Sequence, residues 1–176
     1  LERRILKKAG IDSGRTIVEL GAGLGGTTRA ILRAMPPDAR LLSIEINPRF
    51  HALLNRIEDD RLIAHLGSAC DLKEIISRYE LDPPEVVISG IPFSMMSHDS
   101  GSRVLDAISG SLAPNGRFVA YQVSRRVALL SRPFLGPERS AVELLNLPPM
   151  RVFMWKKNGI RHPAASGVPV SLGKQA

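Results

Sequence analysis

Two acidic residues and three glycines stand at spacings that suit the binding of a nucleoside. Glu19 ends an apolar run, and Gly21, Gly23 and Gly25 follow it, before residues that favour a helix. Glycines in such a turn adopt positive φ and let a ligand approach the main chain closely. Glu45 ends a second apolar run about 20 residues after the glycines, where a carboxylate can hold the two hydroxyls of a ribose. The sequence therefore predicts a site for a nucleoside cofactor.

The glycine pattern fits two classes of cofactor. Gly21, Gly23 and Gly26 satisfy the dinucleotide pattern G-x-G-x-x-G, whereas Glu19 with Gly21, Gly23 and Gly25 satisfies the acidic-x-G-x-G-x-G pattern of proteins that bind S-adenosylmethionine. An acid at position 19 favours a ligand with an ammonium and a sulfonium, and it repels a pyrophosphate. We therefore expect S-adenosylmethionine. A glycine-rich turn without a ligand is the alternative, and the placement of Glu45 counts against it.

The composition is that of a globular protein with a basic surface. The chain has 176 residues, enough for one domain with a core, of which 44% are hydrophobic and 23% charged. No apolar run approaches the roughly 18 residues of a membrane span, and the single cysteine fits a reducing cytoplasm. The net charge of +7 favours a polyanionic partner, either nucleic acid or an anionic membrane. The basic clusters are Arg3, Arg4, Lys7 and Lys8, then Arg125, Arg126 and Arg132, then Lys156, Lys157 and Arg161.

Segments typical of strands and helices alternate along the chain, which indicates a mostly parallel sheet with helices on both faces. The expected strands are at about 16–20, 40–45, 61–66, 85–89, 117–123, 140–147 and 151–157. The expected helices are at about 1–10, 27–35, 47–58, 71–79, 100–112 and 125–131. A short connection between the last two strands predicts a hairpin, which makes one strand antiparallel. Residues 1–162 are expected to form a single domain, and residues 163–176 a loosely ordered tail.

With these elements in place, the chain resembles the class I S-adenosylmethionine-dependent methyltransferases along nearly its whole length. Residues 19–25 resemble the cofactor motif, and residues 44–48 resemble the ribose-binding motif. The resemblance implies an α/β, Rossmann-like sheet of seven strands in the order 3-2-1-4-5-7-6, with strand 7 antiparallel. Ser68 replaces an acid that binds the adenine amine, so Ser68, Asp71 or the backbone is expected to make that contact. The implied cofactor contacts are Glu19, Gly21, Ala22, Gly23, Gly25, Thr27, Glu45, Ile46, Ser68, Ala69, Asp71 and Ser89.

Within that superfamily the chain is similar to bacterial phospholipid N-methyltransferases, which convert phosphatidylethanolamine stepwise to phosphatidylcholine. Residues 87–94, 118–124 and 145–149 carry this similarity. It implies methylation of the amine of phosphatidylethanolamine or its mono- and dimethyl forms. The expected location is the cytoplasm, peripherally on the inner face of an anionic phospholipid membrane. We expect a monomer without a metal, and a membrane-binding N-terminal helix of which residues 1–9 are the end.

The ribosomal RNA adenine dimethyltransferases are the alternative family, because they share the fold and an Asn-x-Pro-aromatic loop after strand four. Here that loop reads Gly90-Ile91-Pro92-Phe93, so the Asn that binds a planar base amine is replaced by a residue without a side chain. RNA or another small amine stays the alternative acceptor. A non-catalytic basic module that binds a membrane or nucleic acid is a third hypothesis, which the intact glycine motif and Glu45 disfavour.

Methyl transfer requires the alignment of an amine, a methyl group and a sulfur more than it requires a base. A largely dry pocket lowers the pKa of the amine, backbone carbonyls orient its lone pair, and an aromatic face holds methylated ammonium products. The expected catalytic residues are Ser89, Gly90, Ile91, Pro92, Phe93 and Tyr121. A loop-to-core anchor is the alternative for Pro92 and Phe93, and a core aromatic on a buried strand is the alternative for Tyr121. His98 and Asp99 are candidate proton acceptors, with a loop or helix cap as the alternative. Arg125 and Arg126 are predicted to contact a lipid phosphate, with a solvated helix face as the alternative.

Overall fold

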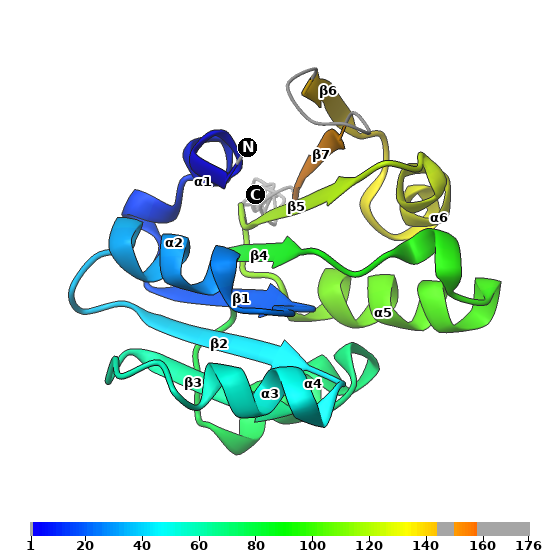
Figure 1. Cartoon of the computed structure of the whole chain (residues 1–176). Coiled ribbons are helices and arrows are strands. Elements are labelled where there is room, and N and C mark those ends of the chain that lie inside the picture. Colours follow the sequence, from blue (N-terminus) through cyan, green and yellow to red (C-terminus); the bar gives the residue numbers. More distant parts are fainter. Residues whose placement is uncertain (1, 144–149, 158–176) are drawn as a thin grey trace, which may run out of the picture.

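The alternating pattern of the sequence folds into a sheet with helices on both faces (Figure 1). A computed structural model describes residues 2–143 and 150–157, and the predicted tail at 163–176 lies outside them. The strands are β1 (Thr16–Leu20), β2 (Arg40–Glu45), β3 (Leu62–Leu66), β4 (Val86–Ser89), β5 (Arg117–Gln122), β6 (Arg139–Glu143) and β7 (Met150–Lys156). The helices are α1 (Glu2–Ala9), α2 (Gly26–Ala34), α3 (Pro48–Leu54), α4 (Leu72–Arg78), α5 (His98–Ser111) and α6 (Arg126–Leu135). Short 3₁₀ turns are η1 (Ile11–Ser13), η2 (Ala69–Asp71) and η3 (Phe93–Met95).

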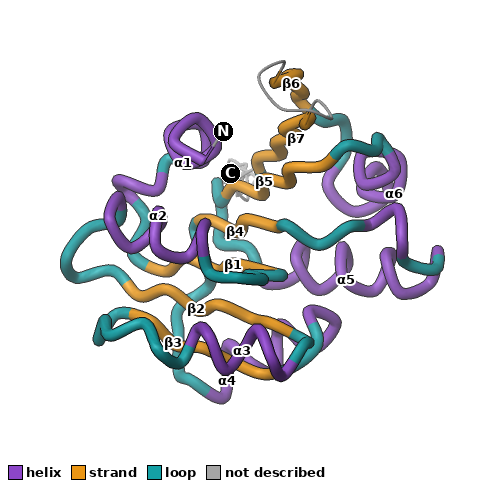
Figure 2. The backbone as a smooth tube through the Cα atoms, viewed as in Figure 1, coloured by secondary structure: helices purple, strands orange, loops and turns teal. Residues whose placement is uncertain are grey.

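The sheet has the predicted topology. Its order is β3-β2-β1-β4-β5-β7-β6, and β7 runs antiparallel to both β5 and β6. The five strands from β1 to β5 are parallel to one another, so their carboxyl ends reach the same edge of the sheet (Figures 1 and 2). The predicted fold class, strand order and antiparallel strand are confirmed. In such sheets ligands bind beyond the carboxyl ends of the strands.

Side chains that alternate along the strands form a core on each face of the sheet. On one face Val18, Leu42 and Val87 pack with buried residues of α4, α5 and α6, and Trp155 stacks on Phe118 with ring centroids 4.9 Å apart. On the other face buried residues of α1 and α2 cover Ile17, Leu41, Val86 and their neighbours. Burial on both faces explains why these strands are continuous apolar runs and fixes their position under the site.

Two predicted helices have different ends from those expected. α3 ends at Leu54 and not near 58, because the amides of Arg56 and Ile57 bond to carbonyls three residues back and tighten the last turn. α6 continues to Leu135, past Pro133 in its last turn, and ends at Gly136, which has a φ of 72°. The expected strand at 140–147 is described from Arg139 to Glu143, and the remainder falls in residues outside the description.

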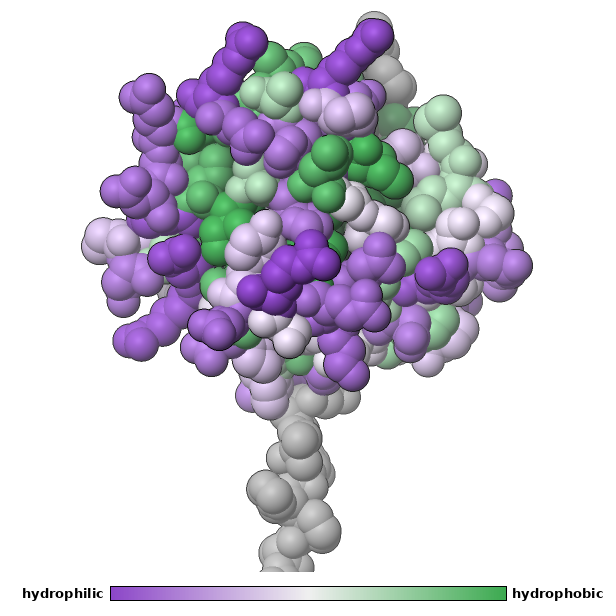
Figure 3. Space-filling view, turned by 90° about the horizontal axis from the view of Figure 1, so that it is seen from below, coloured by the Kyte–Doolittle hydropathy of each residue, from purple (hydrophilic) through white to green (hydrophobic). Residues whose placement is uncertain are grey.

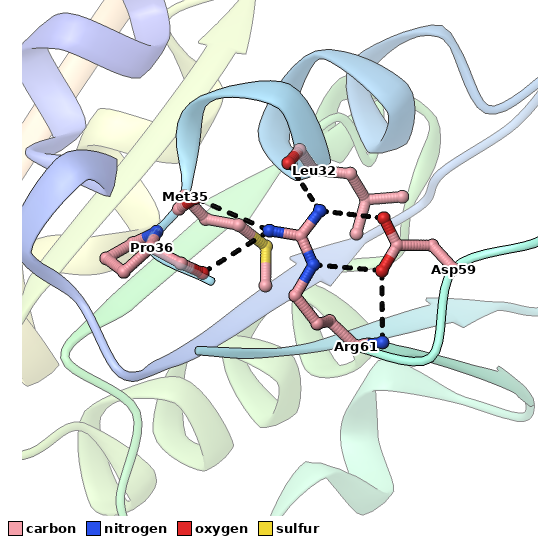
Figure 4. Close-up of polar contacts among 5 residues, drawn as sticks. All are labelled: Leu32, Met35, Pro36, Asp59 and Arg61. Carbon is pink, nitrogen blue, oxygen red and sulfur yellow. Dashed lines mark hydrogen bonds and ion pairs between the residues drawn. The ribbon is translucent and has the colours of Figure 1, made fainter. Parts of the chain in front are cut away.

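An arginine joins the end of α2 to the start of β3, at the edge of the sheet away from the strands' carboxyl ends (Figure 4). The Arg61 guanidinium donates to both carboxylate oxygens of Asp59, at 2.9 and 2.7 Å, and to the carbonyl of Leu32 at 2.8 Å. It also donates to the carbonyls of Met35 and Pro36. The hydrogen bond from Arg61 lowers the pKa of the Asp59 carboxyl. This contact holds the helix end in place without a role at the opposite edge.

Hydrophilic residues predominate on the face around β3, α3 and α4, with hydrophobic residues in separate patches between them (Figure 3). In the part of the chain that the structure describes, no helix combines the length and apolar character needed to cross a bilayer. The structure does not describe the side chains of Arg3, Arg4 and Arg161, which belong to the two predicted basic clusters at the ends of the chain. Of their described members, Lys7, Lys8 and Lys156 are exposed. Lys157 instead donates to the carbonyls of Ser109 and Leu112 at the end of α5.

Candidate active site

The glycine loop after β1 turns sharply at the centre of the sheet edge. Gly21 has a φ of 75°, and its amide donates to the carbonyl of Ile44 at 2.9 Å. A Cβ at position 21 would lie 3.0 Å from the Ile91 side chain and 3.3 Å from its amide nitrogen, so glycine lets the two loops approach. A Cβ at Gly23 would meet nothing within 4 Å. The loop therefore presents its main chain to an open space.

That space is a cavity of about 460 Å³ beyond the carboxyl ends of β1 to β4. Six residues predicted to bind the cofactor line it: Gly21, Gly23, Glu45, Ile46, Ser68 and Ala69. Three residues predicted for catalysis also line it: Gly90, Ile91 and Pro92. Five more residues that were not predicted as contacts line it: Ile44 and Gly67, which belong to the motifs recognised in the sequence, and Phe50, Met96 and Val104, which no motif marked. Ile44 and Gly67 lie next to predicted contacts at the ends of β2 and β3. Phe50 and Val104 come from helices α3 and α5, and Met96 comes from the turn between β4 and α5.

Glu45 joins the glycine loop to the end of β2. One carboxylate oxygen accepts from the Gly23 amide at 2.8 Å, and the other accepts from the Asn47 amide at 2.8 Å. The side chain is 6% exposed, and it lines the cavity. Asn47 in turn caps α3, because its side chain accepts from the Arg49 amide at 2.9 Å. Each carboxylate oxygen can accept more than one hydrogen bond, so Glu45 can still hold hydroxyl groups of a ligand.

Glu19 does not have the predicted cofactor contact. It is fully buried, and one of its oxygens accepts from the hydroxyls of Thr28 at 2.6 Å and Ser43 at 2.8 Å. Strand alternation turns its side chain under α2, away from the cavity. Glu19 therefore ties α2 to β1 and β2, and can act on a ligand by fixing the glycine loop and through its charge.

Five other predicted cofactor residues lie outside the cavity lining. Ala22 and Gly25 are buried within the loop, where the Gly25 amide donates to the Ala22 carbonyl at 3.0 Å. Thr27 lies on α2, and its hydroxyl is 3.3 Å from that of Tyr121. Asp71 is exposed, so of the two residues expected at the adenine amine only Ser68 is at the cavity. Ser89 is fully buried, and its hydroxyl accepts from the Ile91 amide at 3.2 Å, which shapes the loop after β4.

The loop after β4 separates the large cavity from a smaller one of about 190 Å³. Gly90 and Pro92 line both cavities, and Tyr121 and Gln122 of β5 line the smaller one. Phe93 was predicted to offer an aromatic face, but it is fully buried in the core that α5 and α6 cover. Its apolar ring anchors the loop, and Tyr121 is the aromatic residue that reaches the small cavity.

Gln122 is a site residue to which the sequence analysis gave no role. Ligands bind beyond the carboxyl ends of the strands in such sheets, and Gln122 is the last residue of β5. Its hydrogen bond to the loop after β4 is visible only in the structure. Gln122 is 5% exposed, and its amide nitrogen donates to the Ile91 carbonyl at 2.7 Å. That contact fixes the loop after β4 and occupies one of the carbonyls that were expected to orient an amine.

The predicted phosphate contacts lie at the start of α6. Arg125 is exposed, whereas Arg126 is half-buried and lines a groove of about 490 Å³ between α5 and α6. His98 lines the same groove, and its ring is 3.8 Å from the exposed carboxylate of Asp99. Neither His98 nor Asp99 lines the two cavities, so their predicted role as proton acceptors is not supported. The side chain that caps α5 is Ser97, which accepts from the Ser100 amide at 3.1 Å.

Comparison with solved structures identifies this architecture. The N-methyltransferase NodS from Bradyrhizobium japonicum, solved with S-adenosyl-L-homocysteine, superposes with a TM-score of 0.73 over 89% of this chain and 85% of that one, at 11% identity. The chain has the class I methyltransferase fold. The neighbours solved with S-adenosylmethionine or its demethylated product support the predicted cofactor. No protein-family model matches the chain.

Sequence relatives carry the names of several methyltransferases, of which two kinds bear on the acceptor. An ornithine lipid N-methyltransferase from Singulisphaera acidiphila is 28% identical over 120 residues, which cover 67% of this chain and 62% of that protein. A ribosomal RNA small subunit methyltransferase A from Gloeobacter violaceus is 33% identical over 141 residues, which cover 78% of this chain and 44% of that protein. The chain thus spans less than two thirds of the length of these relatives. They agree on methyl transfer and differ in the acceptor.

Proposed function

We propose that this chain is an S-adenosylmethionine-dependent N-methyltransferase that acts on the amine of a lipid, with phosphatidylethanolamine and its partly methylated forms as substrates. The observation that carries the proposal is the pair of cavities that share Gly90 and Pro92. The large one has a glycine loop and Glu45, which suit a nucleoside. The small one has a tyrosine, an amide and apolar walls, which suit an alkyl amine. The lipid N-methyltransferase among the relatives supports a lipid amine.

The residues of the large cavity fit S-adenosylmethionine by their chemistry. Glu45 can accept from ribose hydroxyls, the main chain at Gly21 and Gly23 allows close approach, and Ile46 and Phe50 offer apolar surface to an adenine ring. When bound, the cofactor supplies a methyl group on a sulfonium, and the amine lone pair forms the new N–C bond as the S–C bond breaks with its electron pair on sulfur. The protein has to hold the amine neutral and in line.

The small cavity provides the environment for a neutral amine. Pro92 and Val123 are themselves exposed and Tyr121 is half-buried, and an amine that docks against them exchanges part of its hydration for apolar surface. Loss of hydration disfavours the ammonium form and lowers the pKa of the amine, so the proposal does not require a dedicated base. The proton that the nitrogen loses leaves to solvent. Once the product is a methylated ammonium, the ring of Tyr121 can stabilise it by a cation–π contact. Positioning and desolvation therefore account for the chemistry that the described residues can perform.

We further propose that the protein acts at the surface of an anionic membrane on the cytoplasmic side. Exposed Lys7, Lys8, Arg125 and Arg132 provide positive charge, and each such residue near an anionic surface contributes about 1 kcal/mol. The attraction decays over a Debye length, so association should weaken steeply with salt. Flotation with vesicles that contain or lack anionic lipid measures this; equal binding to neutral vesicles would contradict an electrostatic contact.

The test of the reaction is direct. The purified protein is incubated with radiolabelled S-adenosylmethionine and vesicles of phosphatidylethanolamine, vesicles of ornithine lipid, or total RNA. We expect label in phosphatidylethanolamine, separated by thin-layer chromatography, and loss of that label in Glu45→Ala. Label in ornithine lipid alone would keep the reaction and change the head group. Label in RNA with none in either lipid would overturn the proposal.

Methylation of an RNA adenine is the second candidate, because several relatives are ribosomal RNA methyltransferases and the chain is basic. The local geometry disfavours it. A Cβ at position 90 would lie 2.5 Å from the Tyr121 hydroxyl oxygen and 3.1 Å from the Gly21 carbonyl, so an asparagine at position 90 cannot be accommodated without moving Tyr121. The loop therefore cannot present a side-chain amide to a planar base amine from this position.

A further inference from the structure

The side-chain amide of Gln122, a residue that lines the small cavity, has only one of its two polar atoms paired within the described part of the chain. Its nitrogen donates to the Ile91 carbonyl, which fixes the orientation of the amide because a carbonyl can accept only from the NH₂ group. The oxygen is buried, and it has no hydrogen-bond partner among the described residues. A buried acceptor without a donor is costly, and such groups in folded proteins are usually paired with a ligand or with solvent. The arrangement points to a donor that arrives with the substrate.

We propose that the Gln122 side-chain oxygen accepts a hydrogen bond from the N–H of the acceptor amine and so selects amines that still carry a hydrogen. This inference rests on the proposed function. Gln122 lines the small cavity together with Gly90 and Pro92, the two residues that also line the cofactor cavity. An amine held by Gln122 is therefore next to the boundary that the methyl group must cross. Gln122 is a positioning residue that also holds the Ile91 loop.

The number of hydrogens on the amine makes the inference testable. In the neutral form that attacks, a primary amine carries two N–H groups, its monomethyl form carries one, and its dimethyl form carries none. A site built around an N–H donor loses affinity for a ligand that lacks it, because the buried acceptor stays unpaired. Gln122 should therefore assist the first two methyl transfers and not the third. A role limited to holding the Ile91 carbonyl would affect all three transfers alike.

The experiment compares kcat/KM for phosphatidylethanolamine and its monomethyl and dimethyl forms. We expect Gln122→Met to lose about 10-fold or more on the first two substrates relative to its own loss on the dimethyl form. Gln122→Glu should keep much of the wild-type preference, because burial beside the Ile91 carbonyl favours a protonated acid that can still donate to it and accept from the amine. Ser111→Ala is the matched control, since it removes another buried polar atom without a partner among the described residues, away from both cavities.

Binding of S-adenosyl-L-homocysteine and thermal melting establish that each variant is folded and loaded. Equal losses of Gln122→Met on all three lipids would overturn the role of the oxygen while the proposed function stands. Wild-type protein that methylates none of the three lipids would overturn both. Loss of preference in Ser111→Ala as well would also refute the inference, because the effect would then belong to the fold and not to the cavity.

Discussion

Replacing Gly90 with alanine tests whether the boundary between the two cavities is set by close packing. Gly90 lies where the β4 loop passes β1, and its amide donates to the Leu20 carbonyl at 2.9 Å. A Cβ there would be 2.5 Å from the Tyr121 hydroxyl oxygen and 3.0 Å from the ring carbon that carries it, whereas ordinary contacts begin at 3.4 Å. The carbonyl of Gly21, at 3.1 Å, closes the opposite side. Alanine therefore requires Tyr121 or the glycine loop to move.

The size of the effect follows from this overlap. Inserting a methyl group into a packed site costs about 1–3 kcal/mol in the free energy of unfolding. In a Tyr121→Phe background the closest atom is removed, and the next one has to give by only a few tenths of an ångström. Gly90→Ala should then cost less, with a coupling between the two substitutions of about 1 kcal/mol. Because Gly90 lines both cavities, the single variant should also weaken cofactor binding and methyl transfer.

Denaturant unfolding and calorimetry with S-adenosyl-L-homocysteine measure these effects in the four proteins of the double-mutant cycle. Gly110→Ala is the matched control, because Gly110 is an exposed residue of α5 where a Cβ would meet nothing within 4 Å. That variant should gain about 0.5–1 kcal/mol of stability from helix propensity. Equal stability of wild type and Gly90→Ala, or equal costs with and without the Tyr121 hydroxyl, would refute the reasoning.

Three further predictions concern the cofactor and the fold. Glu45→Ala should weaken binding of S-adenosyl-L-homocysteine by about 1.5–3 kcal/mol in calorimetry, which is the scale of a lost charge-assisted hydrogen bond. Unchanged affinity of the variant would contradict a ribose contact. The wild type should not bind NAD. Arg61→Ala should lower the free energy of unfolding by about 1–2 kcal/mol in urea while cofactor affinity stays unchanged, since it breaks the Asp59 pair and the contacts to α2. Burial, with the nearby charges of Arg78 and His51, lowers the pKa of His65 below 6.5, so the unfolded chain binds the proton more readily than the folded chain. The stability from neutral His65 is therefore complete above pH 6.5 and is lost as the pH falls toward the lowered pKa, and His65→Gln should flatten that part of a stability–pH curve.

The sequence was most informative where backbone conformation or strand ends decide the position of a residue. Gly21 follows β1 and Glu45 is the last residue of β2. Parallel strands bring the residues at their carboxyl ends to one edge, so the positions of both could be predicted from the sequence. Glu19 lies within a strand, where alternation decides its direction, and the motif alone did not show that it faces α2. Phe50 and Val104 reach the cavity from helices, through tertiary packing that no local pattern records.

In the loop after β4, the sequence alone did not show which predicted catalytic side chains reach a cavity. The loop sequence predicted an aromatic wall at Phe93, but an apolar ring beside a proline serves equally well as a core anchor, and here it is fully buried. The aromatic side chain at the small cavity instead comes from β5. Tyr121 was also among the residues predicted for catalysis, and the pairing of β4 with β5 brings it beside the loop, about 30 residues away in sequence.

On the proposed function, two side chains of β5 supply the recognition of an amine that the loop after β4 cannot supply with an amide of its own. Gly90 leaves room for Tyr121 beside the main chain, and Gln122 holds the Ile91 carbonyl while its own side-chain oxygen is buried without a partner among the described residues. A Cβ at position 90 would lie 2.5 Å from the Tyr121 hydroxyl oxygen, so an asparagine in the loop requires Tyr121 to move. A planar base amine suits a side chain that lies beside the ring, whereas a tetrahedral alkyl amine can be held from the adjacent strand. On the proposed function, the glycine at position 90 therefore belongs to a recognition geometry that suits a small, flexible amine.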